Sequence, residues 1–192
     1  YYFLEYEFYG HNIKINCETF IHETGHLLGL DDYYDYDYES GSNALLGGGD
    51  MMDNNVGDHN AFSKALLGWI NPYVVRGTDT TLTIGSLVDT GDAIFIFKDF
   101  KDSIFSEFIM IDLYTPTSLN ECAKGQFGLP SEVGVRIIHV NATLNTEEVY
   151  SIFEITKCNN SYTNIPLLSM IEMDKNNSIV KATIMVSMLT VV

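Results

Sequence analysis

The residues best suited to chemistry lie in one short stretch, HETGHLLGLDD, at positions 22–32. His22 and His26 are four residues apart, so on a helix their imidazoles project from one face, about one turn apart. That spacing allows both rings to bind one Zn²⁺ ion at about 2.0–2.1 Å. Glu23 lies between them and is placed to take a proton from an attacking water and to pass it to a leaving amine. The pattern therefore indicates metal-assisted hydrolysis.

A catalytic zinc site needs a third protein ligand and one open position. Gly29 lets the chain leave the helix and turn back, because glycine adopts a positive φ at little cost. Asp32 follows three residues later and can return a carboxylate to the same ion. Asp31 stands beside it, and Glu39 and His59 are alternative third ligands. The predicted zinc ligands are His22, His26 and Asp32.

The whole string fits H-E-x-x-H-x-x-G-x-x-[H/D]. Requiring Gly29 and Asp32 as well lowers the chance of an accidental match about a hundredfold relative to HExxH alone. The alternative is a helix that carries two histidines and binds no metal. The extended pattern favours the zinc site over that alternative.

Several segments together resemble the metzincin-like zinc endopeptidases of the immune inhibitor A family, which carry HExxHxxGxxD with aspartate as third ligand. GGGDMMD at 47–53 is similar to the family's methionine turn, the tight loop beneath the metal. DHNAFSKALLGWINP at 58–72 is similar to the helix that follows it. SEFIMIDLY at 106–114 and GVRIIHVNA at 134–142 are similar to the β-rich continuation. The resemblance covers about residues 15–142.

The resemblance implies a zinc-dependent endopeptidase, secreted or at the cell surface, that cleaves protein or peptide substrates with a metal-activated water. It implies for Glu23 the role of general base. It also implies that Met52, with Met51 as the alternative, is the turn methionine that supports the imidazoles by apolar packing. A tyrosine near the metal would stabilise the oxyanion, and the sequence offers four candidates. They are Tyr33, Tyr34, Tyr36 and Tyr38.

An Asp- and Tyr-rich loop follows the predicted zinc ligands. Carboxylate oxygens suit Ca²⁺, although the loop lacks the spacing of an EF-hand. The candidate calcium ligands are Asp35, Asp37 and Glu39. The alternative is a solvated acidic loop without a bound ion.

Composition limits the partners that we expect. The chain has 192 residues, 46% of them hydrophobic, and a net charge of −16. It is long enough for one or two domains with a core. The charge repels phosphate backbones and anionic headgroups, so neither nucleic acid nor an acidic membrane is an expected partner. No apolar run reaches the ~18 residues that a membrane span needs.

The three cysteines give an odd count. Cys122 and Cys158 lie in the strand-rich part and could pair in an oxidising compartment. Cys17 stands at the front of the histidine-bearing helix, where we expect a buried small hydrophobe. His139 lies in an apolar run, where we expect a hydrogen-bonded histidine of the core and not a metal ligand.

Two helices are predicted in the first part of the chain. The first runs from about Cys17 to Leu28 and ends at Gly29. Its predicted apolar contacts come from Phe20, Ile21, Leu27 and Leu28. The second runs from Asp58, a good N-cap, to Leu67. Its predicted buried face consists of Phe62, Ala65 and Leu66.

After Pro72 the sequence is rich in β-branched and aromatic runs separated by turn residues, which is typical of a sandwich or half-barrel. The predicted strands there are 81–84, 93–97, 108–114, 135–140, 149–155 and 182–192, and residues 1–9 also read as a strand. The predicted class is α+β. The resemblance implies that residues 1–74 are the C-terminal part of a metzincin-like catalytic domain, and the strand pattern predicts a β-rich, sandwich-like region at 75–192.

Only 21 residues precede His22. We therefore expect the upstream half of the catalytic domain to precede residue 1. Two other functions stay open at this point. The first is an inactive protease fragment whose β-rich region binds protein or carbohydrate. The second is a calcium-stabilised adhesion domain in which HExxH is incidental.

Overall fold

The structure, a computed structural model, describes residues 18–33, 49–53, 56–77, 79–97, 103–125, 129–143, 154–155, 167–173 and 179–186. Its helices are α2 (Glu18–Leu27), α3 (Ala61–Leu66), α4 (Leu87–Thr90) and the 3₁₀ turn η2 (Ser118–Asn120). The strands are β1 (Tyr73–Arg76), β2 (Thr80–Ile84), β3 (Ala93–Phe97), β4 (Glu107–Tyr114), β5 (Gly134–Thr143), β6 (Glu154–Ile155), β7 (Leu167–Met173) and β8 (Ile179–Val186). The chain is thus mixed α/β, and the prediction that helices and sheets occur together is confirmed.

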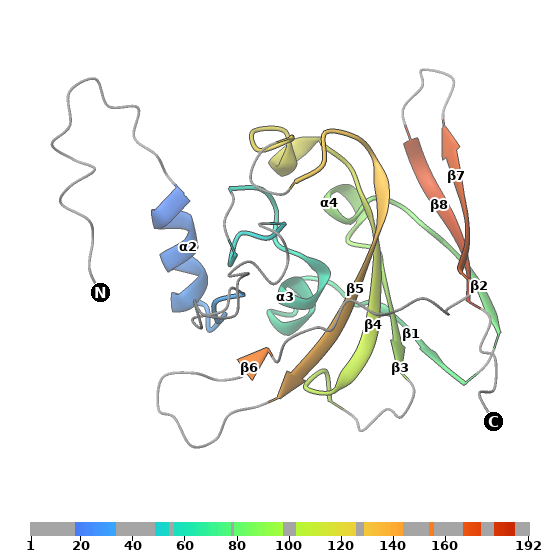
Figure 1. Ribbon diagram of the computed structural model, residues 1–192, viewed down its shortest axis with the longest axis horizontal. Coiled ribbons are helices and arrows are strands. Elements are labelled where there is room, and N and C mark those ends of the chain that lie inside the picture. Colours follow the sequence, from blue (N-terminus) through green and yellow to red (C-terminus); the bar gives the residue numbers. More distant parts are fainter. Residues whose placement is uncertain are drawn as a thin grey trace, which may run out of the picture.

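The strands form two sheets, of five strands in the order β1-β3-β4-β5-β6 and of three in the order β2-β8-β7. Strand β1 runs parallel to β3, and the other pairs are antiparallel. Figure 1 shows α2, then α3, then the five-stranded sheet, then the three-stranded sheet across the molecule. None of the helices in these ranges is long and apolar enough to cross a membrane.

Both faces of β3 and β4 are covered. Phe95 and Phe108 face α3 and belong to a cluster with Phe62 of that helix. Ile94 and Ile111 face the other way and pack with residues of the three-stranded sheet. Because side chains alternate along a strand, burial on both faces explains why these two strands are continuous apolar runs.

The cluster between α3 and the sheet includes residues from both sides of the predicted division at 74/75. Leu30, Tyr33 and Met52 from the first part pack in the same cluster as Leu87 and Phe97 from the second. The division into two domains stays a prediction. As a consequence, the loops on either side of the predicted zinc ligand Asp32 and the turn at Met52 rest on the sheet through one hydrophobic cluster.

Helix α2 has the bounds that the pattern predicts, but its apolar face is wrong. Leu27 is 74% exposed, and Phe20 and Leu28 are also exposed. The buried position on this helix is Gly25, which lies against Met52. The reason is that the face carrying His22 and Gly25, three residues apart, packs inward. The predicted apolar contacts of Phe20, Leu27 and Leu28 are therefore wrong, whereas Ile21 is half-buried.

The predicted N-cap of the second helix is also wrong. Helix α3 begins at Ala61, and its N-cap is Asn60, whose Oδ1 accepts the backbone N–H of Ser63 at 3.0 Å. Asp58 instead forms a buried ion pair with Lys64. Both residue types are good N-caps, and the pairing of Asp58 with lysine leaves the cap to Asn60.

Three of the predicted strands, at 81–84, 93–97 and 108–114, agree with the structure to within one residue. The strand predicted at 135–140 extends further, to Thr143, as β5. Strand β3 coincides with the prediction at 93–97. Of the strands predicted at 149–155 and 182–192, the described residues 154–155 and 182–186 lie in β6 and β8, and β8 begins earlier, at Ile179. The remainder of both predictions lies outside the described residues. Strands β1 and β7 were not predicted from the sequence. The predicted strand at 1–9 lies outside the described residues.

Candidate metal centre

The end of α2 returns the chain toward its own histidines. Gly29 has φ 94°, the left-handed conformation that a glycine adopts cheaply. The N–H of Gly29 donates to the carbonyl of His26 at 2.9 Å, and the N–H of Leu30 to that of Gly25 at 3.1 Å. These two bonds are the Schellman pattern that ends a helix. The turn brings Asp32 back beside the helix, as the sequence analysis expects.

The three predicted zinc ligands meet at this turn. Nε2 of His22 lies 2.8 Å from Oδ1 of Asp32, and Nε2 of His26 lies 3.2 Å from the same oxygen. The ligand atoms of all three lie within 4.8 Å of one another. The two imidazole rings stand edge to face, with centroids 4.8 Å apart. A side-chain set of two imidazoles and one carboxylate is thus assembled around one point.

The other nitrogen of each ring is held by the backbone. Nδ1 of His22 lies 3.0 Å from the carbonyl oxygen of Met51, and Nδ1 of His26 lies 2.9 Å from that of Leu30. A carbonyl oxygen can only accept, so Nδ1 carries the proton in both rings. The lone pair of each neutral ring is therefore on Nε2, which points toward Asp32. This is the outer hydrogen bonding that orients metal-binding histidines.

The dimensions fit a tetrahedral ion. Ligand atoms held about 2.0–2.1 Å from a tetrahedral centre lie roughly 3.3 Å apart. The observed separations of 2.8 and 3.2 Å are about 0.5 and 0.1 Å shorter than this value, and all three ligand atoms lie within 4.8 Å of one another. The side chain of His26 is 26% exposed and that of Asp32 8%. His26 is therefore partly accessible to solvent, whereas the carboxylate of Asp32 is largely buried.

The contacts within the group raise the pKa of both histidines. The hydrogen bond to Asp32 is the largest cause for each, and burial opposes it. The pKa of His26 rises to about 9, with further contributions from the bond to Leu30 and the charges of Asp32 and Glu23. Beside Asp32, His26 therefore holds a proton at neutral pH, and a metal ion that binds there would have to displace it.

Residues 50–53 form a tight turn beneath the histidines. The carbonyl of Met51 binds His22, as described above, and the carbonyl of Met52 accepts the N–H of Tyr33 at 2.8 Å. The side chain of Met52 is fully buried. A Cβ placed on Gly25 would lie 2.3 Å from its Sδ. The two adjacent methionines thus have different contacts: Met51 orients a ring, and Met52 packs under the helix.

A side chain at position 25 should disturb this packing. We expect Gly25→Val to lower the free energy of unfolding by about 1–3 kcal/mol, because the end of the Met52 side chain must shift within a packed core. The matched control is Gly134→Val in β5, where nothing lies within 4 Å of the added Cβ. Urea unfolding of both variants measures the difference. Equal stability of the two variants would contradict the contact between α2 and Met52.

The other predicted site residues lie in different environments. Glu23 is half-buried on α2, and its charge acts on His26. Tyr33 is fully buried, with its hydroxyl 2.7 Å from Oγ of Ser63, so it is not available as an oxyanion donor. His59 is buried against Trp69 and does not join the group of ligand atoms. Tyr34, Tyr36, Tyr38, Asp35, Asp37, Glu39 and Cys158 lie outside the described residues, as does Cys17.

Two predictions concern the later part of the chain. Nε2 of His139 lies 3.0 Å from Oε1 of Glu107, so the predicted hydrogen bonding is confirmed, but the residue is half-buried on β5 and its partner is exposed. Cys122 is exposed and directs its thiol to the carbonyls of Leu119 and Val56. Its pairing with Cys158 stays a prediction.

The sequence analysis missed three contributors to the site. They are the carbonyls of Leu30 and Met51 and the bare backbone of Gly25. Carbonyls carry no sequence signal, since every residue has one. The glycine inside HETGH was a signal, because glycine within a helix usually has a packing reason.

Neither a protein-family model, nor a curated protein, nor a solved structure matches the chain. The functional assignment therefore depends on the geometry of this site and on the motif that forms it.

Proposed function

We propose that the chain is a zinc-dependent endopeptidase, related to the metzincin-like enzymes of the immune inhibitor A family, which cleaves protein or peptide substrates outside the cell. One observation carries this proposal. Nε2 of His22 and Nε2 of His26 converge on the carboxylate of Asp32, while backbone carbonyls hold both Nδ1–H groups. Two imidazoles and one carboxylate are a common ligand set of catalytic zinc.

The donor chemistry supports zinc at this point. Imidazole nitrogen and carboxylate oxygen suit its borderline softness, and three protein ligands leave a position open for reactants. When bound, zinc would polarise the scissile carbonyl and lower the pKa of a coordinated water. His22, His26 and Asp32 would hold it, with the rings fixed by the carbonyls of Met51 and Leu30.

Glu23 supplies the proton transfer. It lies on the histidine-bearing face of α2, one turn from His26, and its side chain is partly exposed. A carboxylate there takes a proton from the attacking water and returns it to the nitrogen of the departing amine. The reaction is a hydrolysis: the peptide C–N bond breaks, and the water oxygen bonds to the carbonyl carbon.

Removal of the metal should stop the reaction. We expect the full-length protein that contains this chain to hydrolyse an unfolded protein such as casein, to lose this activity with 1,10-phenanthroline, and to regain it with added Zn²⁺. Release of acid-soluble peptides measures each step. Zinc bound at one ion per chain without any hydrolysis would contradict the proposal and favour a module that binds protein or carbohydrate.

A further inference from the structure

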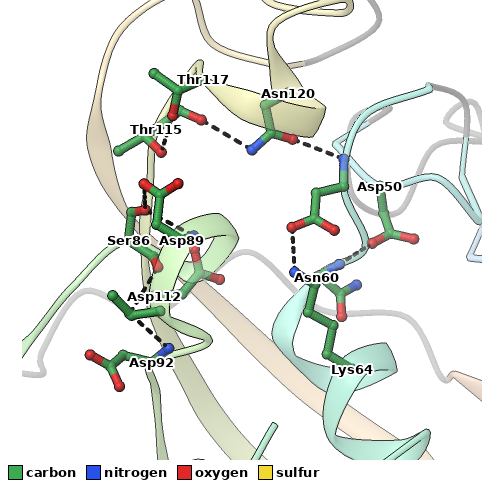
Figure 2. Close-up of polar contacts among 12 residues, drawn as sticks. Asp50, Asn60, Lys64, Ser86, Asp89, Asp92, Asp112, Thr115, Thr117 and Asn120 are labelled. Atoms are coloured by element: carbon green, nitrogen blue, oxygen red, sulfur yellow. Dashed lines mark hydrogen bonds and ion pairs between the residues drawn. The ribbon is translucent and has the colours of Figure 1, made fainter. Parts of the chain in front are cut away.

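The turn under the histidines is organised by one buried carboxylate. Asp50 is 0% exposed. Its Oδ1 accepts the backbone N–H of Met52 at 2.7 Å, and its Oδ2 accepts that of Asn60 at 2.7 Å. Its own carbonyl accepts the N–H of Asp53 at 3.1 Å. Figure 2 shows Asp50 above the start of α3, with its carboxylate joined to the backbone of Asn60. Asp50 thus ties the turn to α3.

The turn at residues 50–53 contacts the candidate metal centre at two points. Its Met51 carbonyl binds the ring of His22, which supplies one predicted ligand. Its Met52 carbonyl binds the N–H of Tyr33, the residue directly after the third predicted ligand, Asp32. The side chain of Met52 meets α2 at Gly25. A shift of the turn would therefore move His22, Asp32 and α2 relative to one another.

Helix capping alone does not account for Asp50. Asn60 already caps α3 with its own side chain, through the N–H of Ser63. Burial of a carboxylate also costs free energy unless the group is well paired. Burial raises the pKa of Asp50 to about 6, against the effect of its two N–H donors and the charge of Arg136. What the carboxylate alone provides is two acceptor oxygens that bridge two backbone donors.

We propose that Asp50 is a positioning residue of the metal centre, because its carboxylate fixes the turn that orients His22 and supports α2. The inference depends on the proposed zinc site. An asparagine at position 50 keeps one acceptor oxygen and turns an amide N–H₂ toward the other backbone N–H. The turn then loses one of its two fixing bonds, and the orientation of His22 loosens.

The test compares Asp50→Asn with the wild type and with a matched control, Asp92→Asn. Oδ2 of Asp92 also accepts a backbone N–H, that of Gly85 at 2.8 Å, but on the far side of the group drawn in Figure 2. Zinc affinity is measured by competition with a chromophoric chelator. The visible absorption of the Co²⁺-loaded protein reports the geometry of the ligands.

We expect Asp50→Asn to bind zinc about 10–100-fold more weakly than the wild type, as loss of an outer hydrogen-bonding partner does. We also expect its Co²⁺ bands to shift, while Asp92→Asn matches the wild type in both measurements. If Asp50→Asn is unfolded without metal, it is refolded with excess Co²⁺, and the spectrum of the saturated protein decides.

The outcomes are distinct. Wild-type affinity together with a wild-type Co²⁺ spectrum in Asp50→Asn would overturn this inference and leave the proposed function intact. A wild-type chain that binds neither Zn²⁺ nor Co²⁺ would overturn the proposed function and the inference with it. Weaker binding and a shifted spectrum in Asp50→Asn alone would establish Asp50 as a positioning residue.

Discussion

Replacement of Glu23 by glutamine is expected to reduce peptide hydrolysis roughly 10²–10⁴-fold, because general base catalysis contributes about that factor. Glutamine has nearly the same shape as glutamate, but its amide does not accept a proton near neutral pH. Glu23 supplies none of the three converging ligand atoms, so the variant should bind as much zinc as the wild type. The expected result is therefore a loss of turnover with an intact metal centre.

The measurement pairs the rate of casein hydrolysis with zinc content determined on the same sample. Glu121→Gln is the matched control, because Glu121 is exposed and lies in the turn after η2. That variant should hydrolyse at the wild-type rate. Wild-type turnover in Glu23→Gln would refute the role of Glu23, and loss of zinc from Glu23→Gln would show that the residue serves the metal site and not proton transfer.

Replacement of His26 by alanine should remove both zinc and activity. His26 contributes one of the three ligand atoms, and Nε2 lies 3.2 Å from Asp32. Two remaining ligands do not complete a zinc site, which needs three protein ligands for catalysis. We expect the fall in zinc affinity to exceed the roughly 10–100-fold that loss of an outer partner causes.

His139→Ala is the control for this ligand variant. His139 is also a histidine with a carboxylate partner, Glu107, but it lies on β5 and outside the group of ligand atoms. The control should retain zinc and hydrolysis. Equal zinc affinity of His26→Ala and the wild type, measured by chelator competition, would exclude His26 as a ligand.

The parts of the site that could be predicted from the sequence depend on local geometry. A four-residue interval on a helix fixes the relation of His22 to His26, and Gly29 sets the turn that returns Asp32. These contacts span at most ten residues of chain, so spacing and residue type suffice. The strands β3 and β4 could also be predicted from the sequence, because burial of both faces makes each a continuous apolar run.

The remainder depends on contacts between distant segments. His22 donates a hydrogen bond to the carbonyl of Met51, 29 residues away. Every residue has a carbonyl, so residue type does not show which carbonyl will accept that bond. The predicted buried face of α2 was wrong. The helix packs inward at Gly25, where the absence of a side chain leaves room for Met52. The N-cap of α3 was misplaced for a similar reason: only the partner of Asp58, Lys64, decides between two good caps.

The most direct test of the central claim is the zinc content of the purified chain, measured by elemental analysis after dialysis against metal-free buffer at neutral pH. The geometry of His22, His26 and Asp32 predicts close to one zinc ion per chain, lost in His26→Ala and kept in His139→Ala. A wild-type chain that holds no zinc, even after incubation with excess Zn²⁺ and dialysis, would contradict the metal centre and the peptidase activity proposed from it.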